Sequence, residues 1–356
     1  MSELIGAWRD RVRAAAAGND PLRIVGGGSK DFYGQELAGT VFGTREYSGI
    51  DDYDPTELVI TARCGTRLSE IEDALAERGQ MLAFEPPHFG ADATLGGCIA
   101  AGLSGPRRPH GGAVRDHMLG VRLLDGRGDD LSFGGRVMKN VAGFDVSRLI
   151  AGSLGTLGII LEASLKCMPL PRAETTIAFE LPAADALSKI NEWSALPLPL
   201  SASCWCGDRL YVRLSGAASA VSAAQRRLGG EETHDALAFW RAIREQQHAF
   251  FRVADGVSLW RLSVRSTAPY ADLGGEQLIE WGGSLRWTCA AADENGERLR
   301  AWARDQGGHA TLFRSKDKSA GAFQALAPPL LALHQRLKTA LDPAGIFNPR
   351  RMYAEL

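Results

Sequence analysis

The sequence predicts an α+β fold with more than one domain, and three observations carry this prediction. From residue 20 to residue 168, short apolar runs of strand length alternate with clusters of glycine. After Pro169-Leu170-Pro171 glycine becomes sparse, and amphipathic helical patterns alternate with strand patterns. The 356 residues are enough for two domains. We therefore expect three segments: a first domain over residues 1–170, an α+β cap domain over residues 171–315, and a C-terminal helix and tail over residues 316–356.

The N-terminal residues form a helical pattern. Leu4, Ile5, Trp8 and Val12 share one helical face, which predicts a short packing helix. A membrane-surface or transit segment is the alternative, because arginine and alanine are enriched there. The segment lacks the apolar core of a secretory signal. No run of apolar residues in the chain approaches the roughly 18 that a transmembrane helix needs, so none is expected.

The rest of the first segment is predicted to alternate strands with turns. Thr66 is the expected N-cap of a helix that ends at Gly79. The turn Asp125-Gly126-Arg127-Gly128 has the composition of a hairpin. Strands are expected at residues 22–26, 57–63, 119–124, 130–133 and 157–166.

The second segment has the pattern of a helix-covered antiparallel sheet. Its strands are expected at residues 175–181, 200–206, 209–214, 257–264 and 283–289. Its helices are expected at residues 183–194, 217–228, 235–252 and 294–306. A last helix is expected at residues 321–341, before the turn Asp342-Pro343-Ala344-Gly345.

Composition excludes several classes of function. The net charge of −2 gives no basic excess, so no nucleic-acid partner is expected. The six cysteines lack the spacing of a disulfide framework, which favours reduced thiols in a cytoplasmic protein. Cys204 and Cys206 are the one close pair, too few ligands for a zinc or iron–sulfur site. We therefore expect no metal.

The glycine turn after the first strand is a candidate phosphate site. Gly26, Gly27 and Gly28 let successive N–H groups point inward, while Ser29 and Lys30 add a hydroxyl group and a charge. With the later glycine clusters, this turn indicates a large anionic cofactor held mainly by backbone N–H groups. An ordinary glycine turn is the alternative.

Two common nucleotide motifs do not fit this turn. A dinucleotide-binding G-x-G-x-x-G motif needs a helix after it, but Gly26 and Gly28 are followed by Asp31 at the last glycine position. The following residues, 32–39, contain two more glycines and make a poor helix. A P-loop is also excluded, because the chain contains no Gly-Lys dipeptide.

Four blocks of sequence occur in a fixed order: GGGSKDFYG from Gly26, TLGGCIAAGLSGPRRPHGGAVRDHMLG from Thr94, KNVAGFDVSRLIAGSLGTLGIILEASLK from Lys139, and DPAGIFNPRRMY from Asp342. The ordered set resembles the FAD-binding domain of the vanillyl-alcohol oxidase type, also called PCMH-type. More closely, it resembles the FAD-binding E-subunit family of bacterial glycolate oxidases. The resemblance covers roughly residues 20–170 and the last fifteen residues. It implies an α+β fold, with a two-subdomain PCMH-type FAD-binding domain, an α+β cap domain and a C-terminal tail that returns to the FAD domain.

The resemblance gives Pro86 and the second block that follows it a role along the cofactor. It implies that a turn faces phosphate or ribitol, that small residues form a wall against the flavin, and that further small residues continue along the ring. The residues concerned are Thr94, Gly96, Gly97, Ala100, Ser104, Gly105 and Gly111. Arg107 and Arg108 balance the pyrophosphate or a substrate carboxylate, or are simply solvated. His110 is a candidate base, with a structural role as the alternative.

The third block is assigned in the same way. In the resembled family, the strand entered through Gly155 and Gly158 lines the adenine and ribose, which implies roles for Ile159 and Ile160. Lys139, Asn140 and Asp145 fall in a matching segment near the cofactor, with a salt-bridged loop as the alternative.

Two absences refine what the resemblance implies. Covalent members of the superfamily link flavin to a histidine where Ser29 stands, so we expect noncovalent FAD. Relatives that oxidise 2-hydroxy acids carry an H-x-G-D-G-N-like motif in the cap, whereas His234, His248 and His309 stand singly. The catalytic residues therefore stay unassigned. The resemblance would place the substrate site on a second FAD-containing subunit.

The expected function is that of an FAD-dependent oxidoreductase subunit. It takes part in the two-electron oxidation of glycolate to glyoxylate, with a second FAD-containing subunit and an iron–sulfur subunit as partners. The expected location is cytoplasmic, including a peripheral position at the inner face of the membrane through partners. Two alternatives stay open: a free-standing flavin dehydrogenase for a 2-hydroxy acid, and a mainly structural assembly subunit.

Overall fold

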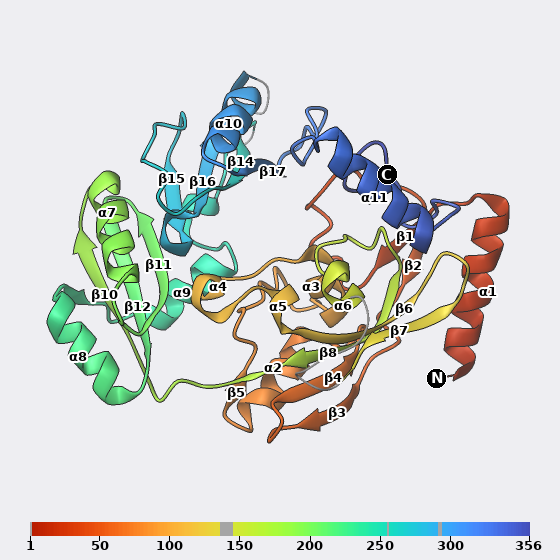
Figure 1. Ribbon diagram of the computed structural model, residues 1–356, viewed down its shortest axis with the longest axis horizontal. Helices are drawn as coiled ribbons and strands as arrows, with labels where there is room; N and C mark the ends of the chain where they lie inside the picture. Colours follow the sequence, from red (N-terminus) through yellow and green to blue (C-terminus); the bar gives the residue numbers. More distant parts are fainter. Residues whose placement is uncertain (1, 136–144, 255, 291–293) are drawn as a thin grey trace.

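The computed structural model describes residues 2–135, 145–254, 256–290 and 294–356, which form two sheet-based domains (Figure 1). The first domain is built on a five-stranded antiparallel sheet. Its strands, in spatial order, are β3 (Ile50–Asp54), β4 (Val59–Arg63), β8 (Ile159–Lys166), β6 (Met118–Leu124) and β7 (Asp130–Gly134).

Helices cover this sheet with apolar side chains at helical spacing. In α2 (Leu68–Ala76), Leu68, Ile71 and Leu75 are fully buried, because positions three and four apart share one helical face. They enter one core with residues of β4, β6 and β8. Residues of α3 (Leu95–Ala101) and α6 (Val146–Ile150) also enter this core, and so does Val114. Short helices α4 (Arg108–Gly111) and α5 (Val114–His117) lie between α3 and α6 in sequence.

A second, smaller layer of the first domain joins the two ends of the chain. Parallel strands β1 (Leu22–Val25) and β2 (Thr40–Gly43) pack against α1 (Ser2–Gly18). The ring of Trp8 meets that of Phe42 edge-on, with centroids 5.2 Å apart. Phe347 near the C-terminus pairs with Leu22, so the tail lies along β1. Short strands β5 (Gln80–Met81) and β9 (Met168–Pro169) form a separate pair.

The cap is built on one eight-stranded sheet in which every strand pair is antiparallel. The helices α7 (Ala183–Ser194) and α8 (Ala218–Leu228) pack on β10–β12, and α10 (Glu294–Asp305) packs on β14 and β17 (Figure 1). The strands, in spatial order, are β13 (Glu231–Glu232), β10 (Ala173–Glu180), β12 (Arg209–Gly216), β11 (Leu200–Cys206), β15 (Gln277–Glu280), β16 (Leu285–Ala290), β14 (Ser258–Ser263) and β17 (His309–Arg314).

The two domains share a buried apolar core. Side chains of the cap sheet, including Cys204 and Trp287, pack with Tyr33, Leu103 and Leu154 of the first domain. This core also takes in α9 (Ala236–Arg244) and the 3₁₀ turn η1 (Ala249–Phe251). Aromatic residues therefore contribute much of the apolar contact between the two domains.

The C-terminal helix α11 (Pro328–Leu341) is anchored by one buried lysine. Lys338 is its one buried residue, and its Nζ donates to Asp342 Oδ2 at 2.7 Å and to the carbonyl groups of Thr156 and Phe347 at 2.8 Å each. The carboxylate of Asp342 in turn accepts the N–H of Phe347 at 2.8 Å. These bonds tie α11 and the tail to the loop before β8.

The structure differs from the sequence expectations at several element ends. Arg67, not Thr66, is the N-cap of α2, because Thr66 Oγ1 instead accepts the N–H of Gly49 and donates to the carbonyl of Arg63. The helix expected at residues 235–252 ends at Arg244, and Gln246 has a left-handed φ of 53°. The last helix begins at Pro328 rather than residue 321, since proline is favoured in a first helical turn. Strands β2, β3, β5, β9, β13, β15 and β17 and helices α3 to α6 were not predicted.

Two general properties of the described residues complete the fold. All six cysteines are free, and only Cys289 is not fully buried. In the ranges given above, no helix has both the length and the apolar composition to cross a membrane.

Candidate cofactor site and inter-domain cavity

The glycine turn after β1 forms one side of a small pocket of about 80 Å³. Thr94 and the α3 residues Gly97, Ala100 and Ala101 also line it, together with Asn348 and Arg351 of the C-terminal tail. The structure thus brings together sequence-predicted residues from two separate blocks with residues of the tail. Those lining the pocket include Gly26, Gly27, Gly28, Ser29, Lys30, Thr94, Gly97, Ala100, Asn348 and Arg351.

The turn fits an anionic group. Among the residues that the structure describes, the backbone N–H groups of residues 27–30 find no hydrogen-bond acceptor. Gly28 has φ = +70°, and a Cβ atom there would meet nothing nearer than Asp31 Oδ2 at 3.7 Å. Successive unpaired N–H groups around a left-handed glycine are a recurring phosphate-binding arrangement. The residues present therefore fit the pyrophosphate of FAD.

Two cations add positive charge to this pocket. Burial lowers the pKa of Lys30, whose Nζ donates to the carbonyl of His88 at 3.1 Å. Burial likewise lowers the pKa of Arg351 to about 10, and its guanidinium donates to the carbonyl of Asp31 at 2.7 Å. A buried cation gains from a nearby anion, so both side chains favour a phosphate group in the pocket.

Asn348 holds the glycine turn next to the tail. Its Oδ1 accepts the N–H of Ile24 at 2.9 Å, and its Nδ2 donates to the carbonyl of Leu154 at 2.7 Å. Asn348 and Arg351 were not predicted as site residues, although both lie in the C-terminal block of the resemblance. That block was the available signal.

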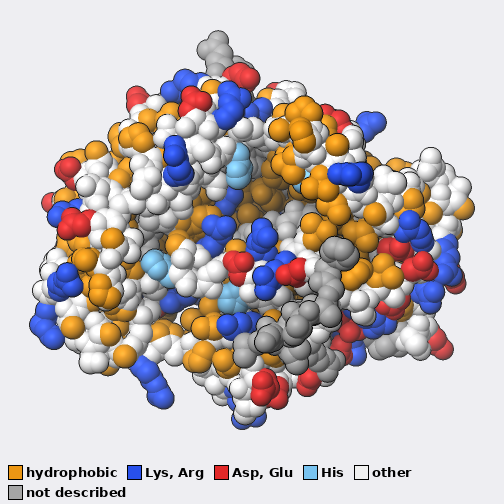
Figure 2. Space-filling view, viewed as in Figure 1, with side chains coloured by type: hydrophobic (Ala, Val, Ile, Leu, Met, Phe, Trp, Pro, Cys, Tyr) orange, Lys and Arg blue, Asp and Glu red, His pale blue; other side chains and the backbone are white. Residues whose placement is uncertain are grey.

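A second, larger cavity of about 540 Å³ lies between the first domain and the cap. Figure 2 shows a hollow in the middle of this face with basic side chains, histidines and some acidic side chains around it. Ala101 lines both this cavity and the pocket at the glycine turn, so the two are neighbours. The first domain contributes small residues, among them Gly102, Ala151 and Gly152. The cap contributes Arg261, Ser263, Trp281, His309 and Thr311.

The consecutive arginines 107 and 108 have opposite surroundings. Arg107 is buried, and its guanidinium pairs with Glu174 at 2.7 Å and with Glu85 at 3.3 Å. Arg108 lines the inter-domain cavity, and its guanidinium carbon lies 4.4 Å from the ring centroid of Trp281. Within the described part of the chain, the side chain of Arg108 makes no ion pair or hydrogen bond.

The other residues left open by the sequence lie away from this cavity or outside the described residues. His110 is exposed on α4, where partial burial and then Arg107 lower its pKa. Asp145 caps α6 by accepting the N–H of Arg148 and also pairs with its guanidinium at 3.1 Å. Lys139 and Asn140 lie outside the described residues.

Several predicted cofactor residues make packing contacts in the second block. A Cβ atom at Gly96 would lie 2.8 Å from that of Cys64. Ser104 Oγ accepts the N–H of Val114 at 3.2 Å, and the carbonyl of Gly105 accepts Trp281 Nε1–H at 3.1 Å. Pro86 is buried, and Gly111 packs closely on the carbonyl of Ala83. In this block Gly105 is thus a contact point between the two domains.

Of the predicted cofactor residues in the third block, one lies beside the pocket and the others make packing contacts. A Cβ atom at Gly155 would lie 2.7 Å from Nδ2 of Asn348, beside the pocket at the glycine turn. Gly158 instead packs on Leu123, and Ile159 and Ile160 are buried in two cores of the first domain. Thr94, expected to face phosphate, is the N-cap of α3 and accepts the N–H of Gly97 at 3.3 Å. The binding roles of all these residues stay predictions. In the described residues, no group of three or more potential metal ligands comes together.

Comparisons with known proteins agree with this geometry. Residues 6–134 match the FAD binding domain family. Over 98% of this chain and 97% of the relative, the sequence is 50% identical to glycolate oxidase subunit GlcE of Escherichia coli (strain K12). The chain belongs to the GlcE family of glycolate oxidase subunits. This confirms the resemblance, the FAD cofactor and the class of FAD-dependent oxidoreductases.

More distant relatives share only part of the chain. The D-lactate dehydrogenase of Archaeoglobus fulgidus is 32% identical over 51% of this chain and 41% of its own length. Glycolate oxidase subunit GlcD of Bacillus subtilis is 32% identical over 39% of this chain and 29% of its own length. A solved structure of alkyldihydroxyacetonephosphate synthase covers 96% of this chain and 74% of its own, with a TM-score of 0.65 and 17% identity. That likeness confirms the predicted fold class.

Proposed function

We propose that this chain is the FAD-binding subunit of a complex that oxidises glycolate to glyoxylate. The observation that carries the proposal is the pocket at the glycine turn, with unpaired N–H groups at residues 27–30 in a chain 50% identical to GlcE over nearly its whole length. FAD supplies the two-electron acceptor when bound. Residues 27–30, Lys30 and Arg351 would hold its pyrophosphate, and the wall of Ala100 and Ala101 would leave room for its ring.

The cofactor is proposed to be noncovalent, because Ser29 offers no imidazole for a flavin bond. The domain assignment belongs to the same proposal: an FAD-binding domain at residues 1–170, a cap at residues 171–315, and a C-terminal segment at residues 316–356 that completes the FAD site. The contacts of Asn348 and Arg351 with the first domain support this last assignment.

The proposed partners are a second FAD-containing subunit and an iron–sulfur subunit that accepts electrons. The proposed location is cytoplasmic, including peripheral association with the inner face of the membrane through partners. Support comes from the name of the E. coli relative, which is a subunit of glycolate oxidase. A free-standing 2-hydroxy-acid dehydrogenase is a second candidate, favoured by the basic cavity beside the cofactor pocket.

One preparation tests these proposals together. The purified full-length chain should be yellow, and acid precipitation should release all of its flavin to the supernatant. Added to the partner subunits prepared without it, the chain should restore glycolate-dependent reduction of a dye. A colourless chain that restores activity would establish an assembly role instead. Turnover of a 2-hydroxy acid by the chain alone, at the rate of the complex, would establish the free-standing dehydrogenase. Flavin that stays on the precipitate would contradict noncovalent binding.

A further inference from the structure

The inter-domain cavity is lined by arginines that have no carboxylate paired directly with them in the described residues. Among the residues lining it are Arg108, Arg115 and Arg261, and none is an aspartate or a glutamate. Arg261 lies on β14 of the cap, and its guanidinium carbon is 5.1 Å from the ring centroid of Trp281. Like Arg108, Arg261 makes no ion pair or hydrogen bond with any described residue. Two guanidinium groups from different domains therefore stack on one indole ring.

Two arginines at the domain boundary are instead paired with carboxylates. Arg213 is buried, and it lies 2.8 Å from Glu85 Oε1 and 3.9 Å from Glu174 Oε2. Arg107 is paired with the same two carboxylates. Buried charges in proteins are normally paired in this way, because an uncompensated buried cation is costly. Stacking on Trp281 offsets only part of that cost.

Burial lowers the pKa of Arg108 and repulsion from Arg261 lowers it further, while the carboxylate of Asp116 acts in the opposite direction. Burial also lowers the pKa of Arg261. Tyr33 and Glu280 act in the opposite direction on Arg261, but burial is the largest effect at both side chains, so an anion in the cavity would stabilise both charged groups. Arginine suits a carboxylate in particular, since its planar fork matches the two oxygens.

We propose that Arg108 and Arg261 together form a binding site for the carboxylate of a small 2-hydroxy acid in this subunit. The proposal rests on the proposed function and deepens it, because it gives this chain a substrate site of its own. The site lies beside the wall at Ala101 that borders the cofactor pocket. The apolar ring of Trp281 forms its floor, and His309 and Thr311 offer polar partners for a hydroxyl group.

The sequence favoured the opposite assignment, a substrate site on a partner subunit, because the cap lacks a histidine-rich motif. Arg261 was not predicted as a site residue, because nothing in the sequence distinguishes a single arginine within a predicted strand. Only the docking of the cap brings it onto the same indole ring as Arg108. The pyrophosphate of FAD does not need these arginines, because the glycine turn supplies its own donors.

The probe is oxalate, a small dicarboxylate that cannot lose a hydride. We expect isothermal titration of the full-length chain, with and without bound FAD, to show one binding site for oxalate. Glycolamide, which is similar in size to glycolate but uncharged, should not bind there. Arg108→Met and Arg261→Met should each weaken oxalate binding by about tenfold to a hundredfold, as expected for losing a hydrogen-bonded charge.

Arg314→Met is the matched control. Arg314 also lacks an ion pair in the described residues and stacks on a ring, 4.3 Å from the centroid of Phe32, but it lines a different pocket. Its variant should bind oxalate like the wild type. Arg261→Lys keeps the positive charge but loses the planar guanidinium group, so it should bind oxalate with intermediate affinity. It replaces Arg261→Met in the test if that variant does not fold.

Three results would overturn the proposal. The first is that oxalate does not bind to the wild-type chain, and the second is that a double variant with both Arg108→Met and Arg261→Met binds oxalate with unchanged affinity. The third is that the folded single variants lose FAD. The last would assign the arginines to the cofactor. Failure here is separable from failure of the proposed function, which flavin content and the restored activity of the complex measure independently.

Discussion

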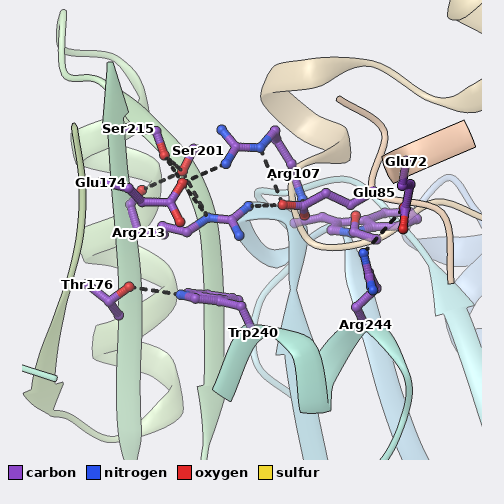
Figure 3. A network of polar contacts seen from close by, with 12 residues as sticks. Glu72, Glu85, Arg107, Glu174, Thr176, Ser201, Arg213, Ser215, Trp240 and Arg244 are labelled. Carbon is purple, nitrogen blue, oxygen red and sulfur yellow. Dashed lines mark hydrogen bonds and ion pairs between the residues drawn. The ribbon is translucent and has the colours of Figure 1, made fainter. Parts of the chain in front are cut away.

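Arg213 of β12 and Glu85 of the loop after β5 form an ion pair across the domain boundary, with Nη2 2.8 Å from Oε1 (Figure 3). The N–H of Arg107 donates to the other oxygen of Glu85 at 2.8 Å, and its guanidinium reaches Glu174 of the cap. Glu174 also accepts from Ser215 Oγ. Carboxylates and guanidinium groups of both domains therefore alternate in one network. The network fixes the loop that carries Arg108.

Glu85→Gln should destabilise the protein, because it removes the charge that faces both Arg107 and Arg213. Removing one partner of a buried pair costs about 3–5 kcal/mol, and we expect the lower end since Glu85 retains 17% side-chain exposure. Urea unfolding measures the loss. Glu231→Gln is the control, because its pair with Arg209 is exposed and should contribute less than about 1 kcal/mol. Equal stability of the two variants would mean that the network does not stabilise the contact between domains.

Gly28→Val should abolish flavin binding and leave most of the fold intact. A branched side chain is strained at φ = +70°, and it would stand beside the N–H groups that face the pocket. Flavin content and far-ultraviolet circular dichroism measure the two effects. Gly43→Val is the control, because a Cβ atom at Gly43 meets nothing within 4 Å and its φ is not in the left-handed region. Wild-type FAD affinity in Gly28→Val would place the phosphate site elsewhere.

Lys338→Met should release the C-terminal tail. It leaves the fully buried carboxylate of Asp342 without its cation and the carbonyl groups of Thr156 and Phe347 without a donor. The expected loss of stability is about 3–5 kcal/mol. Limited proteolysis should then cut after α11, and FAD should be lost as Arg351 moves away. Lys189→Met, which removes an exposed pair with Glu192, should change neither property. A protease-resistant Lys338→Met chain would contradict the anchoring role.

Glu280 should make stability depend on pH. Its Oε2 accepts Trp287 Nε1–H at 2.9 Å, and burial raises its pKa from 4.5 to about 7. Between pH 4.5 and about 7, Glu280 binds its proton more tightly in the native state than in the unfolded state. The protonated carboxyl group therefore stabilises the native state, and this stabilisation is fully present below pH 4.5. It is lost as the pH rises to about 7, by on the order of 3 kcal/mol. Glu280→Gln should remove this contribution, and the difference between the two unfolding free-energy profiles isolates it. Parallel profiles would show that Glu280 titrates normally.

The sequence predicted structure best where the residues that form the local pattern are the same residues that determine the element. The helix expected at residues 183–194 is α7, because alanine, leucine, isoleucine and tryptophan recur on one face. The glycine turn at residues 26–30 lies at the end of β1 with its N–H groups unpaired. In contrast, β15 is four residues long and wholly buried, so it shows no alternation of polar and apolar residues.

The candidate site was harder to predict, because it depends on contacts between distant segments. Arg107 and Arg108 are neighbours in sequence, and nothing local distinguishes them. Glu174 of β10 pairs with the first, while Trp281 of the cap stacks on the second. Ser104 and Gly105 were expected along the flavin, yet their polar groups bond to Val114 and Trp281. Sequence spacing located the loop but did not indicate which of its side chains face the cavity.

The place of Asn348 has a consequence for biosynthesis. Its amide group joins Ile24, one of the first strand residues to be made, to Leu154 near the middle of the chain. Arg351 then closes the same pocket over Asp31. The residues of the glycine turn are made early, but the pocket is complete only after residues 348 and 351 have been made. A chain cut short before residue 348 would therefore lack Asn348 and Arg351 at the pocket.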